Sequence, residues 1–589
     1  MRKYLLLLYC SLLLLIFISP ACRNQEKTEK ISEEDIQFTE FKDRLVLKFW
    51  KLHPDWATAV GFHKYDNLLV IPTPERREAV IRSYKAFTKE LDSFSPRKLS
   101  ENNQIDFWML HNFLEEGIWR LQEFKSYEWD PSEYNLGNPV AEILNGRYAD
   151  LNTRLRAISE KMAGSVDYYE AAIKNLRRPT LEHTQLAIDQ NLGALPVFQP
   201  ALTDSLENSN LPDLEKMLLR QRIETTRLAI ENFVSYLQEK ELPKLQQEGG
   251  RNFRIGRDAF EQKFRYEIQS GYTASEIYQK AMLHKQELHK QMQQATRQLW
   301  PQYFPDQPMP EGLAAVKQMI NRLSRNHVPR DSFLTAIENQ IPQLVKFVNE
   351  KNLLTQDPTK PLIVRPTPLY MQGVAGASIS APGPYDKAAP TYYNVAPLDK
   401  YTPEQAESYL REYNRYMVQI LNIHEAIPGH YTQLVYSNRS PSIIKAILGN
   451  GAMVEGWAVY AERMMLENGY GQNSPEMWLM WYKWNLRVTL NAILDYSVHV
   501  LNMSRADALR LLTEEGFQET AEAEAKWKRA TLSQVQLSSY FTGYTEIYDL
   551  REELKKTQGA GFNLKAFHEK FLSYGSAPVK YIKQMMLAE

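Results

Sequence analysis

The sequence predicts a large, mainly helical protein with a small β-sheet in its C-terminal part. Apolar residues recur at helical spacing through most of the chain, as at Ile230, Phe233, Val234 and Leu237. One stretch, 361–397, breaks this pattern with short runs of strand-forming residues between Pro and Gly clusters. Because 589 residues are too many for one simple core, we expect one large domain or two of medium size.

The N-terminus has the pattern of an export signal. Two basic residues precede an apolar run over 4–18, which is short for a membrane span, and small residues then lead to Cys22. This arrangement predicts a signal peptide over 1–21 and resembles a bacterial lipobox, although Ser19 stands where leucine is usual. We expect an exported lipoprotein, anchored through lipid on Cys22 and a tether over 22–33, at the periplasmic or cell-surface face of a membrane. The alternative is an uncut transmembrane anchor.

Composition and charge exclude some classes of protein. The two cysteines, Cys10 and Cys22, both lie in the N-terminal segment, so the mature chain is expected to have no disulfide and to depend on core burial for stability. The 70 basic and 71 acidic residues nearly balance, and no basic stripe is present. This balance gives no reason to expect a nucleic-acid partner.

A weakly marked boundary lies between residues 242 and 256, where Pro243 and three glycines interrupt the helical pattern. We therefore predict an N-terminal helical half over 34–250 and a C-terminal catalytic half over 251–589. Helices are expected from Ser32 onward and, with their start signals, over 74–94, 102–124, 212–237 and after the capping box Thr273–Glu276.

The stretch that breaks the helical pattern predicts the small sheet, with strands at Leu362–Val364, Ser378–Ser380 and Tyr392–Val395. Directly after it, Thr402 and Gln405 form a second capping box with Pro403 in the first turn. We expect one long helix from there, with His424 on its apolar stripe. A histidine on a buried face is more often a core residue than a ligand, so its neighbours decide the interpretation.

Those neighbours form the segment His-Glu-Ala-Ile-Pro-Gly-His, residues 424–430. In the zinc-peptidase pattern HExxH, two histidines four apart hold the metal and the glutamate is the general base. Here Pro428 takes the position four after His424, where its ring clashes with the helix and should open it. Gly429 can then bend the backbone and bring His430 back toward His424. The alternative is a helix that ends at Pro-Gly, with two unrelated surface histidines.

A third metal ligand is predicted at Glu455, because catalytic zinc sites use three protein ligands and His₂Glu is one known set. Glu462 lies seven residues further on, on the same helical face, as an alternative ligand or as the partner of an imidazole. The alternative for each glutamate is a solvated helix face. It is weaker for Glu455, which stands among apolar residues.

The segment HEAIPGH followed by EGWAVYAE resembles a bacterial exported-protein family, domain of unknown function 885 (DUF885), whose motif is HExxPGH and which is grouped with gluzincin-type zinc peptidases. The resemblance covers nearly all of the mature chain. It implies a gluzincin- or carboxypeptidase-like fold with a deep cleft and one Zn²⁺ ion. By this resemblance His424, His430 and Glu455 are the metal ligands and Glu425 is the general base.

Further site residues follow from the same comparison. His499 and Tyr540 are candidate donors to the oxyanion of the transition state, and Asp495, one helical turn before His499, is a candidate partner of an imidazole. The alternatives are a core histidine bonded to Asp495 and a tyrosine that only packs. Tyr392 and Tyr393 match the strand before the motif.

The chain departs from the family at two positions. Tyr431 stands where the family usually has a second histidine, and Phe541 replaces the usual lysine of a QxxSYK segment. These departures leave the ligand set intact. With Tyr392 and Tyr393, Tyr431 completes the predicted substrate-contacting residues, whereas a role for a cation at 541 is put in doubt.

We therefore expect a zinc-dependent metallopeptidase that cuts short peptides, with Glu425 taking a proton from water and passing it to the leaving amine. Two alternatives stay open. One is a lipid-anchored, metal-containing binding or scaffold protein without turnover, against which the presence of Glu425 argues. The other is a zinc hydrolase of a non-peptide amide or ester. The sequence does not predict the cleavage preference or the oligomeric state.

Overall fold

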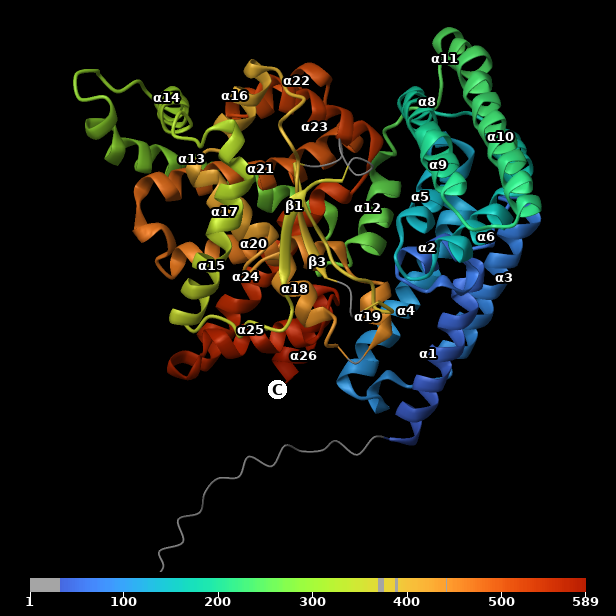
Figure 1. Cartoon of the computed structure of the whole chain (residues 1–589). Coiled ribbons are helices and arrows are strands. Elements are labelled where there is room, and N and C mark those ends of the chain that lie inside the picture. The colour runs from blue at the N-terminus through green and yellow to red at the C-terminus, as the bar shows by residue number, and fades with distance from the viewer. Residues whose placement is uncertain (1–31, 369–375, 387–389, 441, 589) are drawn as a thin grey trace, which may run out of the picture.

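The computed structural model describes residues 32–368, 376–386, 390–440 and 442–588, and it is mainly helical with one three-stranded sheet (Figure 1). The predicted signal peptide and Cys22 lie outside the described residues. In the described part of the chain, no helix combines the length and the apolar character needed to cross a membrane.

The first part of the chain is entirely helical. It begins with α1 (Glu33–Leu52), α2 (Pro54–Ala59), α3 (Pro74–Leu91) and α4 (Glu101–Trp119). It continues with α5 (Gly137–Asn145), α6 (Leu151–Met162), α7 (Ser165–Asn175), α8 (Leu181–Pro196), α9 (Thr203–Glu207), α10 (Asp213–Tyr236) and α11 (Leu242–Glu248). The helices predicted over 74–94, 102–124 and 212–237 correspond to α3, α4 and α10.

The second part holds the sheet and the longest helices. Before the sheet come α12 (Gly256–Glu267), α13 (Ala274–Tyr303), α14 (Leu313–Leu323) and α15 (Phe333–Glu350). After the sheet follow α16 (Pro403–Glu412), α17 (Arg415–Glu425), α18 (His430–Ser437), α19 (Ile443–Ile447), α20 (Gly451–Glu467), α21 (Pro475–His499), α22 (Arg505–Arg510), α23 (Thr520–Leu532), α24 (Ser539–Gln558), α25 (Leu564–Ser573) and α26 (Val579–Ala588).

Two hydrophobic cores divide the molecule differently from the predicted halves. One core is confined to helices α5 to α10, and its buried residues run from Tyr134 to Leu237. The other joins α1 to α4 with the whole C-terminal part. Figure 1 shows the first group of helices gathered on one side, while α4 lies against α19 and α26. The boundary predicted near residue 250 thus follows the end of the smaller core, but α1 to α4 pack with the C-terminal part.

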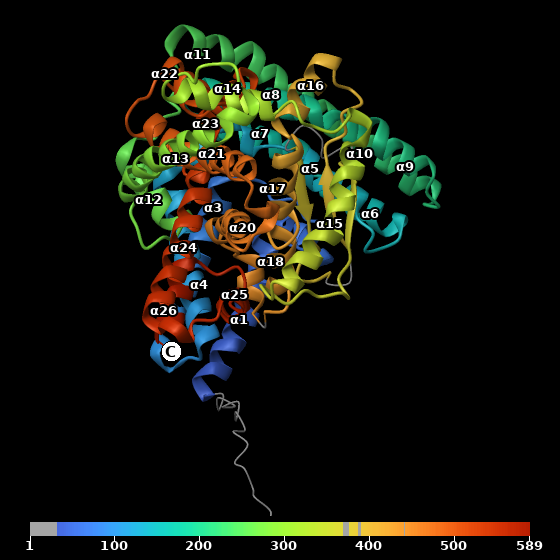
Figure 2. The same ribbon diagram turned by 90° about the vertical axis from the view of Figure 1, so that its left-hand side faces the viewer.

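The predicted strands are present as β1 (Leu362–Pro366), β2 (Ala377–Ser380) and β3 (Thr391–Val395). Their order is β1-β3-β2, with β1 parallel and β2 antiparallel to the central β3. The sheet packs beside α15 and α17, with β1 against α15 and β2 against α17 (Figure 2). β2 is therefore the edge strand next to the helix that carries His424.

The helix before the motif is broken where one long helix was predicted. The capping box at Thr402 is present, as is the one at Thr273, but α16 ends at Glu412. Asn414 then caps α17, because its Oδ1 accepts hydrogen bonds from the backbone N–H groups of Tyr416 and Met417. The prediction of a single helix was wrong because asparagine at this position satisfies the free N–H groups of a new helix start.

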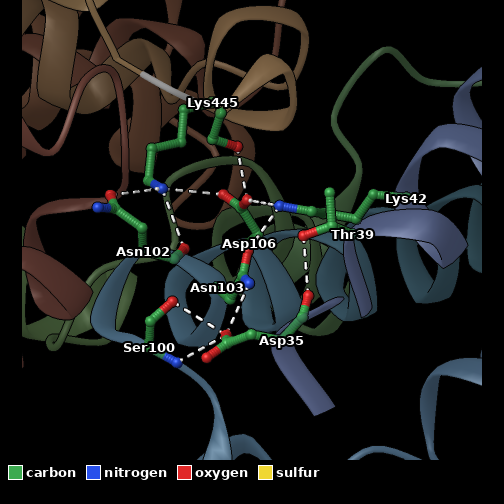
Figure 3. Close-up of polar contacts among 9 residues, drawn as sticks. Asp35, Thr39, Lys42, Ser100, Asn102, Asn103, Asp106 and Lys445 are labelled. Atoms are coloured by element: carbon green, nitrogen blue, oxygen red, sulfur yellow. Dashed lines mark hydrogen bonds and ion pairs between the residues drawn. The ribbon is translucent and has the colours of Figure 1, made fainter. Parts of the chain in front are cut away.

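A buried cluster of charges joins α1 and α4 to α19 in the C-terminal part (Figure 3). Asp106 is fully buried, and its carboxylate accepts hydrogen bonds from Lys42 at 2.7 Å and from Lys445 at 2.9 Å. Asn103 also accepts from Lys42, and the hydroxyl of Ser442 donates to Asp106. Burial alone would raise the pKa of Asp106, but the two ammonium groups outweigh it and hold the pKa below its ordinary value. The cluster fixes α19, which connects α18 to α20.

Candidate metal centre

The break between α17 and α18 places two histidines beside each other. Helix α17 ends at Glu425, and α18 begins at His430. The two imidazole rings, of His424 and His430, have centroids 4.7 Å apart and lie nearly perpendicular. The backbone therefore ends one helix and starts another, rather than opening a single helix by two residues.

This connection depends on glycine. A Cβ atom at position 429 would lie 1.9 Å from the carbonyl oxygen of His424 and 2.3 Å from that of Ile423. No side chain fits there, so Gly429 is what allows the chain to pass this close to the end of α17. The indole N–H of Trp457 in α20 donates a 2.8 Å hydrogen bond to the carbonyl of Pro428 and fixes the connection from the other side.

Glu455 of α20 completes the cluster. Its Oε2 lies 3.4 Å from Nε2 of His430 and 3.8 Å from Nε2 of His424. The three side chains each offer a ligand atom within 4.8 Å of the others, and no other set of this kind is found among the described residues. Burial alone would raise the pKa of Glu455, but the histidines outweigh it and the pKa is lowered, so the carboxylate is ionised.

Helix α20 is held in place by a close crossing with α24. A Cβ at Gly456 would lie 2.3 Å from the carbonyl carbon of Gly543, and one at Gly543 would lie 1.7 Å from the carbonyl oxygen of Ala452. Two glycines thus let the backbones of α20 and α24 touch, directly beside Glu455. This contact brings the first turn of α24, which carries Tyr540, to the metal-ligand cluster.

Glu462 orients His424. Nδ1 of His424 donates a 2.6 Å hydrogen bond to the fully buried carboxylate of Glu462, which leaves Nε2 facing Glu455. The indole N–H groups of Trp481 and Trp484 donate to the same carboxylate at 3.2 and 3.0 Å. Burial, and after it the charge of His430, lowers the pKa of His424 to about 4. His424 is therefore the neutral imidazole that a metal ion requires.

Glu425 lies beside this cluster. It is half-buried at the last position of α17, and its carboxylate is near enough to contribute to the pKa of both imidazoles. Within the described ranges, no group forms a hydrogen bond or ion pair with its carboxylate. A carboxylate in this position is free to accept a proton.

The donor set fits a zinc ion. Two imidazole nitrogens and one carboxylate oxygen, with a fourth position left for substrate or water, form a known catalytic zinc set. The carboxylate–imidazole hydrogen bond from Glu462 is the supporting contact that such ligands usually have. His424, His430 and Glu455 are the residues that would hold the ion.

Tyr540 lies near the ligand cluster, together with a cation that the motif analysis missed. Burial and the nearby charge of Glu455 raise the pKa of Tyr540. Arg529 of α23 donates hydrogen bonds to Oε1 of Gln536 at 2.6 Å and to the hydroxyl of Tyr540 at 3.4 Å. Arg529 belongs to no motif of the sequence, and its hydrogen bonds to Gln536 and Tyr540 are what reveal it.

His499 and Asp495 lie elsewhere in the packing. Nε2 of His499 contacts the backbone carbonyls of Ala530 and Ser533 at 2.8 and 3.1 Å, and its ring stacks on a phenylalanine. Asp495 accepts hydrogen bonds from the backbone of Val535 and from Ser538, rather than from an imidazole. Both residues therefore hold the segment that leads into α24, and they do not contact the metal ligands or each other.

The three predicted substrate-contacting tyrosines have separate environments. Tyr393 is fully buried, and its hydroxyl donates a 2.9 Å hydrogen bond to Asn422 of α17. Tyr392, on the opposite face of β3, is half-buried under the guanidinium of Arg365. Tyr431 is buried and donates to the carbonyl of Lys360. Tyr393 thus ties the sheet to the motif helix.

A deep cleft at the metal ligands stays a prediction. A cavity of about 540 Å³ lies between α3, α4 and the start of α20, and its wall includes Tyr84, Glu116, Gln269 and Asn450. None of the three metal-ligand residues lines this cavity. It opens near the N-terminal end of the helix that carries Glu455.

The fold and the ligand cluster define a large helical protein in which a broken helix and its neighbour present two histidines and a glutamate to one point. The chain belongs to the family described as bacterial protein of unknown function (DUF885), whose model matches residues 54–586. The predicted resemblance to this family is thereby confirmed. No curated protein matches the chain.

Two solved structures are similar. A candidate lipoprotein of unknown function from Shewanella oneidensis is 52% identical, with a TM-score of 0.87, and the match covers 93% of this chain and 99% of that one. A second candidate lipoprotein, from Colwellia psychrerythraea, is 16% identical with a TM-score of 0.78, and the match covers 95% and 99%. The second comparison shows a shared fold alone.

Proposed function

We propose that this protein is a zinc-dependent hydrolase of the gluzincin type that acts as a peptidase on short peptides. The observation that carries the proposal is the convergence of His424, His430 and Glu455, with ligand atoms within 4.8 Å of one another, beside the unpaired carboxylate of Glu425. A binding or scaffold protein needs the ligands but has no use for a free base next to them.

A peptide substrate is favoured by the sheet. β2 is one of the two edge strands of the described sheet and packs against α17, which carries His424 and Glu425. An edge strand presents backbone N–H and C=O groups to which an extended peptide can add as a further strand. A non-peptide amide or ester offers no such series of groups.

The chain's own residues account for the proton transfers. A bound zinc ion would supply a Lewis acid that polarises the scissile carbonyl and increases the acidity of water. Glu425 accepts the proton of the attacking water and delivers it to the leaving nitrogen, so that the C–N bond is replaced by a C–O bond. Tyr540, beside Glu455, is the hydroxyl donor placed to stabilise the oxyanion.

The decisive experiment is a peptide-library digest with the mature chain, with and without a chelator, together with its metal content. We expect about one zinc ion per chain, cleavage of short peptides, and loss of cleavage on chelation with recovery on adding zinc. Metal without cleavage of any peptide would favour a binding protein, whereas ester or non-peptide amide hydrolysis alone would favour the other alternative. Protein without metal affinity would contradict the site.

We also propose that the protein is a membrane-anchored lipoprotein, modified at Cys22. The sequence pattern before Cys22 supports this, as does the description of the 52% identical structure from Shewanella oneidensis as a candidate lipoprotein. In the native host, Cys22→Ser should move the protein from the membrane fraction to the soluble fraction. Unchanged membrane retention would contradict lipidation at this residue.

A further inference from the structure

The structure contains an unpaired cation beside the metal ligands. Arg529 is exposed on α23, and its guanidinium reaches across to the start of α24. Within the described part of the chain, no carboxylate forms an ion pair with it. Most other arginines near this region are paired, as Arg487 is with Glu522 at 2.9 Å.

The hydrogen bonds of Arg529 occupy the acceptor oxygens of Gln536 and Tyr540 and leave N–H and O–H donors around its guanidinium. Its NH2 group donates to Oε1 of Gln536 at 2.6 Å and more weakly to the hydroxyl oxygen of Tyr540 at 3.4 Å. The amide N–H₂ of Gln536, the O–H of Tyr540 and the other guanidinium N–H groups are all donors. A group of donors around an unpaired positive charge is suited to an anion, and a planar guanidinium matches a carboxylate in particular.

The position of this group is set by the ligand helix. The glycine crossing of α20 and α24 brings the start of α24, which carries Tyr540, to the part of α20 that carries Glu455. The charge of Arg529 is near enough to help the two histidines lower the pKa of Glu455 against the effect of burial. Arg529 therefore lies close to where a scissile bond would be held. The guanidinium is exposed, so a substrate can reach it.

Position 541, where the family usually has a lysine, holds a phenylalanine in this chain. Phe541, which replaces the usual lysine, is buried and its ring lies 5.5 Å from that of His284 in α13. Arg529 thus supplies a positive charge near the site from another helix.

We propose that Arg529, oriented by Gln536, binds a carboxylate of the substrate next to the scissile bond. This inference rests on the proposed peptidase function and names its substrate class. The carboxylate is either the C-terminus of a short peptide, which would make the enzyme a carboxypeptidase or dipeptidase, or an Asp or Glu side chain. Arg529 is here a binding residue, separate from the proton transfers at Glu425.

The test compares three matched peptides with the zinc-loaded mature chain: one with a free C-terminus, its C-terminal amide, and an amide that carries Glu at the last position. We expect the free acid or the Glu amide to be cleaved at least about tenfold more efficiently than the plain amide. Preference for the free acid assigns the C-terminus, and preference for the Glu amide assigns a side chain. Equal cleavage of all three would overturn this inference while the peptidase function stands, and no cleavage of any would contradict the peptidase function itself.

The variants are Arg529→Gln and, as a control that removes the same charge one position away, Lys528→Gln, which is also exposed. Arg529→Gln should raise KM for the preferred peptide by about tenfold or more, leave kcat nearly unchanged, and have little effect on the plain amide. Lys528→Gln should change neither. An equal loss on all peptides, or an equal loss in both variants, would show a general electrostatic effect and overturn the inference.

A binding measurement separates recognition from turnover. In the Glu425→Gln background, the dissociation constant of the preferred peptide should rise by about tenfold when Arg529 is also changed to Gln. The dissociation constant of the plain amide should not change. Unchanged affinity for the preferred peptide would overturn the proposal independently of any activity.

Discussion

The Lys42–Asp106–Lys445 cluster and the His424–His430–Glu455 cluster are both built from charged or titratable side chains between helices that are distant in sequence. In the first, the oxygens of Asp106 accept from two lysines and a serine, and all three charged side chains are nearly inaccessible. In the second, the ligand atoms of two histidines and a glutamate lie within 4.8 Å of one another, and among the described residues no donor bonds the carboxylate of nearby Glu425. Burial of charge alone therefore does not indicate function, whereas ligand atoms that converge on one point are suited to a metal ion.

The sharpest test of this comparison is Glu425→Gln. The variant keeps the shape and the three ligands but cannot accept a proton, so kcat should fall by about 10²- to 10⁴-fold. Metal content and unfolding free energy should stay close to those of the wild type. Glu404→Gln, an exposed position at the start of α16, serves as the control and should be fully active. Near-normal activity of Glu425→Gln would remove Glu425 as the base.

In the Lys42–Asp106–Lys445 cluster, by contrast, a substitution should lower stability and leave zinc binding unchanged. Asp106→Ala leaves two buried ammonium groups without their carboxylate and should lower the unfolding free energy by about 3–5 kcal/mol. The folded variant should still bind zinc with normal affinity. Asp43→Ala, an exposed site on α1, should change stability by less than about 0.5 kcal/mol. Denaturant unfolding checks both variants, and a small effect at Asp106 would show that the cluster relaxes or admits water.

The same cluster has a defined pH dependence. Because its ion pairs hold the pKa of Asp106 below the ordinary value of 3.8, their contribution is complete above that pH and is lost as the pH falls through the lowered pKa. Asp106→Asn should therefore flatten the loss of stability in acid relative to the wild type. If the unfolding free energy falls equally steeply with decreasing pH in both proteins, other carboxylates are responsible for acid unfolding.

A smaller effect is expected from Glu462→Gln. The amide can still accept from Nδ1 of His424, but it cannot take up the imidazole proton as Glu462 can, whose pKa is raised by burial. Loss of such a supporting contact typically weakens metal affinity by about 10- to 100-fold. Competition with a chelator of known affinity measures the change. Unaltered zinc affinity would mean that burial alone orients His424.

The comparison also explains how much the sequence could predict. The three strands and both capping boxes follow local rules, so they could be predicted from the local sequence. The convergence of His424, His430 and Glu455 was expected from the HExxPGH motif and the family resemblance. The Asn414 helix start was missed because one apolar stripe continues across it. The Lys42–Asp106–Lys445 cluster and the approach of Arg529 to Tyr540 depend on how distant helices pack, as do the contacts of Asp495, and no local pattern encodes them.

The smallest predicted effect concerns Tyr393, which was expected to contact substrate. Its hydroxyl donates a hydrogen bond to Asn422, and the amide of Asn422 in turn donates to Gln340. The donors and acceptors of this buried series are therefore satisfied, as they are in the Lys42–Asp106–Lys445 cluster. Tyr393→Phe should lower the unfolding free energy by about 1–2 kcal/mol by leaving the oxygen of Asn422 unpaired, with KM unchanged. Tyr392→Phe, on the other face of β3, should leave stability unchanged. A raised KM with normal stability in Tyr393→Phe would show that the hydroxyl reaches the substrate. The inference that polar groups with satisfied hydrogen bonds serve the fold would then fail beside α17, the helix that carries His424.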